Sequence, residues 1–277
     1  MKQVFFNLNE DFESIIHKSM PNCKIYNAKL IPTGWTNIVY EVETDKGNYF
    51  FRFPRDEFWS RTIVKDCEFS KYINKKTDYK TVELKLLYDN GRPFSMHKKI
   101  EGIPLAEKMN NLNNKEIEGI SKDIAKFMYQ LHNIKDEKNN IFTVTNIGTN
   151  LTDFLDELLN KHIDETGRKF WNKKNINNKE KCLVHGDLNS SNILLDKNNN
   201  VTAIIDFGFA GFGNKYNDIG RIIGRCPEKF KSNIIEKYEE CSKEKLDNNF
   251  LEENIETWNK IDNSYIDYMT NIGIYKK

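Results

Sequence analysis

Long apolar runs and paired cysteines are both missing from this sequence. No stretch approaches the ~20 consecutive apolar residues that a membrane-spanning helix needs. The five cysteines are scattered, odd in number and include no CxxC pair, which argues against a disulfide framework or a zinc site and favours a reducing compartment. The N-terminal stretch MKQVFFNLNEDFESII reaches acidic residues too early for the apolar part of a signal peptide. We therefore expect a cytoplasmic protein without a membrane partner.

An excess of charge of one sign is missing as well. The chain has 42 Lys and Arg against 41 Asp and Glu, a net charge of +1, which gives no overall attraction to nucleic acid. The basic stretch GRKFWNKKNINNKEK is better explained by the general abundance of Lys and Asn than by a nucleic-acid site. With 277 residues, the chain can bury the core of one large domain or of two packed lobes. We expect no nucleic-acid partner, and a monomer or weak dimer.

The first hundred residues show mainly strand patterns. The candidate strands are KIYNAKLI, IVYEVET, NYFFRFP, VELKLLY and RPFSMHKKI. DKG and DNG are turn sequences that would close two hairpins, and residues 60–73 read as a helix between them. One helix in a small antiparallel sheet is the simplest arrangement.

Helical patterns dominate after a short connector near residues 97–104. In NKEIEGISKDIAKFMYQLHNI the apolar residues recur at intervals of three and four, and LTDFLDELLNKHI repeats this pattern. Two short apolar runs, NILLD and VTAIID, interrupt the helices, which resume from about Tyr216. We predict an α+β fold, with a β-rich region over residues 1–100 and a helical region with a small β insert over residues 101–277.

The segment VHGDLNSSNILLDKNNNVTAIIDFG carries the chemistry of most interest. Asp187, Asn192 and Asp206 supply the oxygen ligands that Mg²⁺ prefers. The two strands would return Asp206 to the loop that holds Asp187 and Asn192, and Gly208 would permit a sharp turn after Asp206. Any one of these residues alone would fit a surface turn or the end of a buried strand. Their combination and order favour a catalytic site.

HGDLNSSN followed by IIDFG resembles the catalytic and metal-binding loops of the protein-kinase-like superfamily. The Gly after the His is similar to the aminoglycoside phosphotransferase and choline kinase group. The resemblance implies a two-lobed fold, with a nucleotide-binding lobe over residues 1–100 and the catalytic and acceptor sites over residues 101–277. It implies that Asp187 is the catalytic base and that Asn192 and Asp206 are magnesium ligands. The residues that it implies as supports of these loops are His185, Gly208 and Asp218.

The same resemblance places the nucleotide site, with ATP or GTP as donor and Mg²⁺ as cofactor. The phosphate-covering loop would consist of Thr33, Gly34, Trp35, Thr36 and Asn37. Arg52 stands where the family has a phosphate-contacting Lys, and Glu68 would be its partner on the following helix. The residues of the connector that would pass the edge of the base are His97, Lys98 and Lys99. A polar hairpin turn, a sheet-edge arginine and a solvated helix face are the plain alternatives.

We expect the phosphoryl acceptor to be a small molecule rather than a protein. Protein kinases carry Arg after the His, where this chain has Gly186, and only FGFAGFGNKYN separates Asp206 from Asp218, too short for a peptide-docking segment. The acceptor would carry a hydroxyl group. It would lie between the catalytic loop and the last helices.

The C-terminal helical stretch is locally acidic and has interleaved aromatic residues. The candidate acceptor residues are Glu239, Glu240, Trp258, Asp262 and Tyr265. An acidic cleft would favour a cationic acceptor, above all an aminoglycoside-type antibiotic. Choline or ethanolamine kinase and macrolide kinase are alternatives, and solvated helix faces with core aromatics would explain the same residues. A non-catalytic nucleotide-binding or coat protein of the same fold is the alternative of another class, against which the intact Asp187, Asn192 and Asp206 argue.

Overall fold

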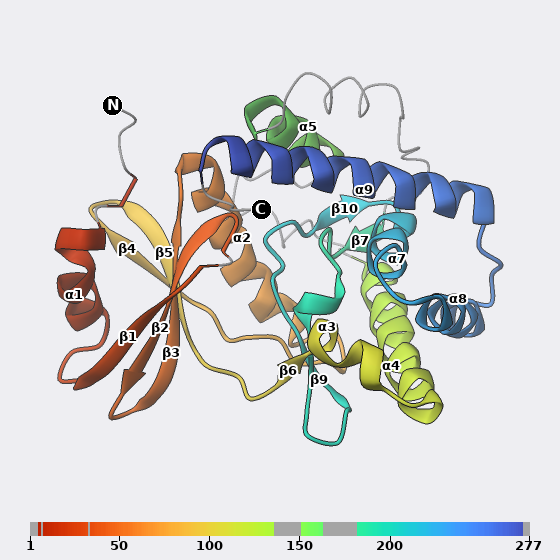
Figure 1. The fold of residues 1–277 in the computed structure, drawn as a ribbon, viewed down its shortest axis with the longest axis horizontal. Coiled ribbons are helices and arrows are strands. Elements are labelled where there is room, and N and C mark those ends of the chain that lie inside the picture. The colour runs from red at the N-terminus through yellow and green to blue at the C-terminus, as the bar shows by residue number, and fades with distance from the viewer. Residues whose placement is uncertain (1–4, 7, 33, 136–150, 163–181, 274–277) are drawn as a thin grey trace. The chain divides into compact units, whose positions relative to one another are not determined.

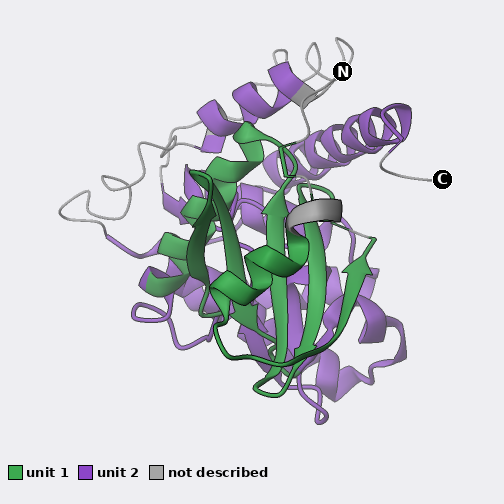
Figure 2. Cartoon of the chain, turned by 90° about the vertical axis from the view of Figure 1, so that its left-hand side faces the viewer, with its two compact units in different colours: residues 1–71, 82–101 green, residues 72–81, 102–277 purple. Residues whose placement is uncertain are grey.

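The computed structural model describes residues 5–6, 8–32, 34–135, 151–162 and 182–273. It divides into two compact units, one of residues 1–71 and 82–101 and one of residues 72–81 and 102–277 (Figure 2). An antiparallel sheet forms the N-terminal region and helices make up most of the C-terminal region (Figure 1). The predicted α+β fold is confirmed.

The first unit is built on one antiparallel sheet. Its strands are β1 (Ile25–Ile31), β2 (Asn37–Thr44), β3 (Gly47–Pro54), β4 (Lys85–Asp89) and β5 (Arg92–Lys98), in the spatial order β1-β2-β3-β5-β4. Both predicted hairpins form. Asn90 and Gly91 join β4 to β5 with φ angles of 49° and 77°, the left-handed pair that a tight two-residue hairpin turn requires.

Helices cover both faces of this sheet (Figure 1): α1 (Leu8–Ser19), which the sequence patterns did not predict, and α2 (Glu57–Ile73). Because strand side chains alternate between faces, Phe51 and Phe53 of β3 point to the α1 side, where both are fully buried in one apolar cluster with α1 residues. Arg52 lies between them in sequence and therefore points to the α2 side. The alternation thus fixes the direction of this guanidinium group.

Lys65 of α2 is a buried amine, with 1% of its surface exposed, and burial lowers its pKa to about 7 from 10.5. Between these two values the unfolded chain holds a proton that the folded chain lacks, so the free energy of unfolding rises with pH by about 1.4 kcal/mol per unit. We expect Lys65→Met to remove this slope, measured by urea unfolding at pH about 7.5 and 8.5. The matched Lys71→Met change, at an exposed α2 position, should keep it. An unchanged slope in Lys65→Met would contradict the assignment.

Two small sheets organise the second unit. The strands β6 (Ile103–Pro104), β8 (Ile193–Leu195) and β9 (Val201–Ile204) form one sheet in that order, and β7 (Cys182–Val184) pairs with β10 (Gly211–Gly213) in the other. The predicted hairpin of NILLD and VTAIID is confirmed, because Ile193 pairs with Ile204 across β8 and β9. This pairing brings the start of β8 next to the end of β9.

The helical segments of the second unit are α3 (Leu105–Lys108), the 3-10 helix η1 (Met109–Asn111), α4 (Asn114–His132), α5 (Leu151–His162), the 3-10 helix η2 (Ser190–Asn192), α7 (Lys215–Ile223), α8 (Glu228–Ser242) and α9 (Asn248–Asn271). The α4 stripe is buried as predicted: Ile117, Ile120, Ile124, Phe127, Met128 and Leu131. Asn113 caps α4 through a reciprocal pair of hydrogen bonds with Glu116. Within the described ranges, none of the helices has the length and apolar content that crossing a bilayer demands.

Candidate active site

The loop between β7 and β8 carries the HGDLNSSN sequence and is tied to the segment that follows β9. His185 is fully buried, and its Nε2 donates a hydrogen bond to Ile205 O at 3.0 Å. Its Nδ1 accepts from Asp187 N at 3.3 Å, and its ring packs on Phe207 with the centroids 4.4 Å apart. His185 therefore sets the spacing between the two loops of the sequence motif.

Gly186 is required by the backbone rather than by side-chain chemistry. Its φ angle is +80°, and a Cβ placed on it would lie 2.3 Å from Phe209 O. Asp218 of α7 holds the same loop: its Oδ1 accepts from Gly186 N at 2.9 Å and its Oδ2 accepts from His185 N at 2.8 Å. No larger side chain fits at position 186 without moving the loop.

Asp187, Asn192 and Asp206 converge in the second unit. Asn192 Nδ2 donates to Asp187 O at 2.9 Å, and Ile205 N donates to Asn192 O at 3.0 Å, which places Asp206 beside Asn192. Burial raises the pKa of the Asp187 carboxyl above its ordinary value; Arg221 opposes this shift, and the nearby Asp206 carboxylate adds to it. Asp206 has a left-handed φ of 71°, a conformation held by its surroundings.

This arrangement fits a magnesium ion bound together with phosphate oxygens. Asn192 donates through its nitrogen, and no described residue donates to its Oδ1. Mg²⁺ commonly takes one or two protein oxygens and fills its other positions with phosphate and water. The parts of the chain that the structure describes hold no cluster of three or more His, Cys, Asp or Glu suited to a metal. The protein oxygens of Asn192 and Asp206 would therefore suit a metal ion that also binds phosphate oxygens.

Two buried side chains, His132 and Tyr238, hold Asp218 in place. The sequence patterns did not predict either of them. His132 Nε2 lies 3.2 Å from Asp218 Oδ2, and His132 Nδ1 lies 2.8 Å from the hydroxyl of Tyr238. These residues come from the end of α4 and from α8. Neither belongs to a recognisable motif, so only the packing of α4, α7 and α8 reveals the chain of contacts.

Arg221 of α7 is another site residue that sequence reasoning missed. Its Nε and Nη2 both donate to Asp187 Oδ1, at 3.0 and 2.7 Å. Its Nη1 bonds to Asp262 of α9, which also accepts from Arg225. The candidate base is thus ion-paired with a buried guanidinium group.

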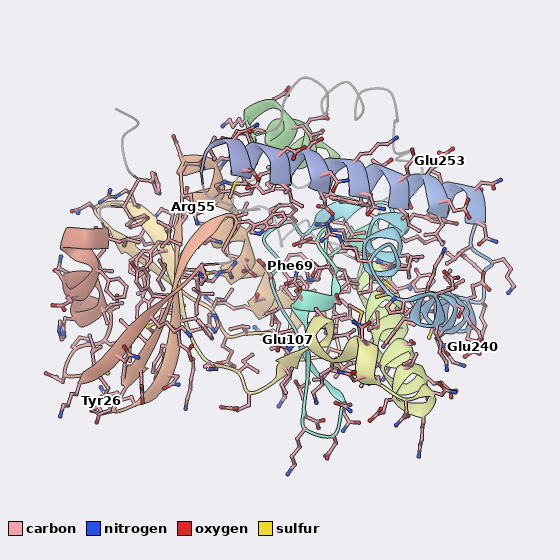
Figure 3. The ribbon with its side chains drawn as sticks, in the orientation of Figure 1. Tyr26, Arg55, Phe69, Glu107, Glu240 and Glu253 are labelled. Carbon is pink, nitrogen blue, oxygen red and sulfur yellow. The ribbon has the colours of Figure 1, made fainter. Side chains whose placement is uncertain are left out.

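The structure separates the predicted acceptor residues into two sets. Asp262 and Trp258 of α9 meet at Arg221, whose guanidinium lies 4.6 Å from the Trp258 ring, and Tyr265 is buried further along α9. The other two lie on α8 and pair with lysines: Glu239 with Lys245 at 2.5 Å, and Glu240, labelled in Figure 3, with Lys237 at 3.0 Å.

In the first unit, the loop before β2 is braced by an arginine that was not predicted. Thr33 lies outside the described residues. Arg55, labelled in Figure 3, donates from Nη2 to Gly34 O at 2.8 Å and from Nε to Trp35 O at 3.1 Å. Its backbone N donates to Thr36 O at 3.1 Å. At the start of β2, the buried Asn37 donates to the Thr36 hydroxyl at 2.8 Å. These contacts shape residues 34–37 into a defined loop.

The predicted ion pair between Arg52 and Glu68 is wrong. Arg52 Nη1 bonds to Asp66 Oδ2 at 2.5 Å, and Asp66 also accepts from Ser70. Glu68 Oε2 is buried and has no hydrogen-bond partner in the described part of the chain, and burial raises the pKa of Glu68. Residues two apart in a helix point in nearly opposite directions, so only one of the two acids can face β3.

The predicted connector residues begin inside β5. His97 and Lys98 pair with Phe50 and Tyr49 of β3, whereas the pairing with β4 ends at Met96. Burial lowers the pKa of His97 to about 4, and its ring packs on Phe50. Lys99 Nζ bonds to Glu41 of β2 at 2.7 Å, so its side chain is held against the sheet.

Comparison with known proteins assigns the family. The family model described as "Phosphotransferase enzyme family" matches residues 27–241. The chain belongs to this phosphotransferase family. Its enzymes are kinase-type, in agreement with the loop motifs.

Solved structures of the same fold cover nearly the whole chain. The GDP and kanamycin complex of APH(2")-IIia matches with a TM-score of 0.72 and 20% identity, over 96% of this chain and 93% of that one. The streptomycin-ATP-APH(2")-IIa ternary complex matches with 0.62 and 20%, over 98% and 91%. The apoenzyme of macrolide 2'-phosphotransferase MphH from Brachybacterium faecium matches with 0.64 and 13%, over 95% and 93%. At these identities the likeness establishes the fold.

Proposed function

We propose that this phosphotransferase moves the γ-phosphoryl group of ATP or GTP to a hydroxyl group of a small molecule. The observation that carries the proposal is the convergence of Asp187, Asn192 and Asp206, linked by the Asn192 hydrogen bonds at 2.9 and 3.0 Å. Phosphoryl transfer needs phosphate-bound metal, an oriented hydroxyl and cationic contacts, and little covalent chemistry from the protein.

Asp187 orients the acceptor hydroxyl and takes its proton as the acceptor oxygen bonds to the γ-phosphorus. The bond from the γ-phosphorus to the β,γ-bridging oxygen breaks, and nucleoside diphosphate leaves. Asn192 Oδ1 and the Asp206 carboxylate would hold Mg²⁺, and the bound ion would supply positive charge to neutralise the phosphates. His185 and Asp218 keep the two loops in register through their contacts with Ile205 and with the loop amides. Gly208 lies in the buried turn after Asp206 and would support this loop.

The nucleotide is held by the first unit in this proposal. Arg52, fixed by Asp66, contacts phosphate, and residues 34–37 cover the phosphates with the support of Arg55. The backbone of residues 97–99, which lies beyond the last β4 pairing, would read the edge of a purine. ATP and GTP both suit such contacts.

Among acceptors, an aminoglycoside is the first class to test, and macrolides, choline and ethanolamine follow. Two solved structures of the same fold contain kanamycin and streptomycin, respectively. We propose Trp258, Asp262 and Tyr265 as the part of the acceptor site on α9. Glu239 and Glu240 would line it only after release from their lysines.

An acceptor screen tests the function directly. The purified chain is incubated with ATP or GTP, with Mg²⁺ or with a chelator, and with kanamycin, streptomycin, a macrolide, choline or ethanolamine. We expect nucleoside diphosphate release that requires both Mg²⁺ and one acceptor class, with phosphate found on that acceptor by mass spectrometry. Tight nucleotide binding without transfer to any acceptor would instead support the non-catalytic alternative.

A further inference from the structure

The contact between Asp187 and Arg221 is one-sided. Both guanidinium bonds, at 3.0 and 2.7 Å, end on Oδ1 of the carboxylate, and Asn189 Nδ2 also donates to this oxygen at 3.2 Å. From the described residues, the other oxygen, Oδ2, receives only a long contact of 3.4 Å, from Asn192. One oxygen of the candidate base is therefore saturated with donors, while the other is available to a ligand.

Arg221 is itself fixed from the side of α9. Its side chain is 9% exposed; its Nη1 bonds to Asp262, and its Cζ lies 4.6 Å from the ring centre of Trp258. Asp262 is 6% exposed and also binds Arg225, so it joins two arginines of neighbouring turns. A guanidinium group held on three sides has little freedom to swing away from Asp187.

Two glycines bring the helices close enough for these contacts. A Cβ on Gly220 would lie 3.2 Å from Asn254 Cβ, and one on Gly224 would lie 3.0 Å from Ile255 Cγ2. Both glycines lie on the side of α7 that faces α9. The close approach explains how a residue of α7 can bind the catalytic loop and the last helix at once.

We propose that Arg221, held by Asp262 and Trp258, is a positioning residue that orients Asp187 for proton transfer. By engaging Oδ1, it turns Oδ2 towards the acceptor hydroxyl and keeps the carboxylate from rotating. The last described helix thereby contributes to catalysis without touching the reacting atoms. This inference rests on the proposed role of Asp187 as the base.

The test compares Arg221→Met with Lys215→Met. Lys215 is also a cation of α7 paired with a carboxylate, Glu244 at 2.7 Å, but that pair does not include Asp187. We expect Arg221→Met to lower kcat by about 10- to 100-fold, since small misplacements of a catalytic group have losses of this size, with the KM for nucleotide changed less than about twofold. Lys215→Met should retain the wild-type kcat. Arg225→Met, which leaves Arg221 bonded to Asp262, should have a smaller effect than Arg221→Met.

A double variant separates positioning from a general structural role. In an Asp187→Asn background, Arg221→Met should produce no further loss of kcat, because its effect passes through the lost carboxylate. A wild-type kcat in Arg221→Met, or an equal further loss in the Asp187→Asn background, would overturn the proposal. If Arg221→Met fails to fold, the same comparison is made with Arg221→Lys, which keeps the buried positive charge but lacks the two guanidinium N–H groups that bond to Asp187. Failure of the proposed function itself would appear earlier, as full activity in Asp187→Asn alone.

Discussion

Asp187→Asn is expected to lower kcat by about 10²- to 10⁴-fold, equivalent to about 2.7–5.5 kcal/mol of transition-state stabilisation. The amide cannot accept the proton of the acceptor hydroxyl, but it has nearly the shape of the carboxylate and can still receive hydrogen bonds from Arg221 and Asn189 through its oxygen. Nucleotide affinity should therefore change little. Steady-state kinetics with the acceptor identified by the screen, together with calorimetric nucleotide binding, measure both quantities.

The matched control for this variant is Glu228→Gln. Glu228 begins α8, its side chain is 82% exposed, and its ion pair with Lys231 spans 3.9 Å. This change removes one negative charge without altering the catalytic loop, so kcat should stay within about twofold of wild type, as for most surface substitutions. If Asp187→Asn and Glu228→Gln gave the same kcat, Asp187 would not be the base.

The order of chemical groups along the chain made the core of the site predictable. The candidate base and the candidate magnesium ligands lie in HGD, at the Asn five residues later, and in IIDFG. Two short apolar runs within this segment predicted the hairpin that brings these residues together. The pairing of Ile193 with Ile204 then follows from ordinary strand geometry. These relations are local, within about twenty residues, and local patterns are what a single sequence reveals.

The partners of these groups depend on how helices dock, which the sequence does not reveal. Arg221 reaches Asp187 across 34 residues and Asp262 across 41. The choice between Asp66 and Glu68 as the partner of Arg52 depends on the rotation of α2 about its own axis. A shift of two residues exchanges the two acids, and the apolar pattern of α2 did not fix its rotation well enough to decide.

The ion-pair partners of the acidic C-terminal stretch could not be predicted from the sequence either. Glu239, Glu240, Glu244 and Glu256 each bind a lysine, and Asp262 binds two arginines. The local excess of acid is thus largely balanced by cations, some of them on other elements. A count of charges along the sequence overstates the negative potential that a cationic acceptor would meet.

Asp218→Ala is expected to destabilise the second unit by about 3–5 kcal/mol, because it removes the partner of several buried groups at once. Asp218 is fully buried; its two oxygens accept from His185 N at 2.8 Å and Gly186 N at 2.9 Å, and His132 lies 3.2 Å away. Alanine would leave both amides without an acceptor, and the catalytic loop would lose its anchor. Urea unfolding followed by fluorescence measures the loss of stability, and kcat should fall in parallel.

Asp123→Ala provides the matched comparison for Asp218→Ala. Asp123 of α4 is also a carboxylate of the second unit, but it accepts a single side-chain hydrogen bond from the described residues, from the Tyr79 hydroxyl at 3.0 Å. Its loss should cost about 0.5–1.5 kcal/mol, the ordinary value for a single hydrogen bond, and should leave kcat unchanged. Equal destabilisation by the two variants would show that the loop amides find other acceptors. The anchoring role of Asp218 would then be refuted.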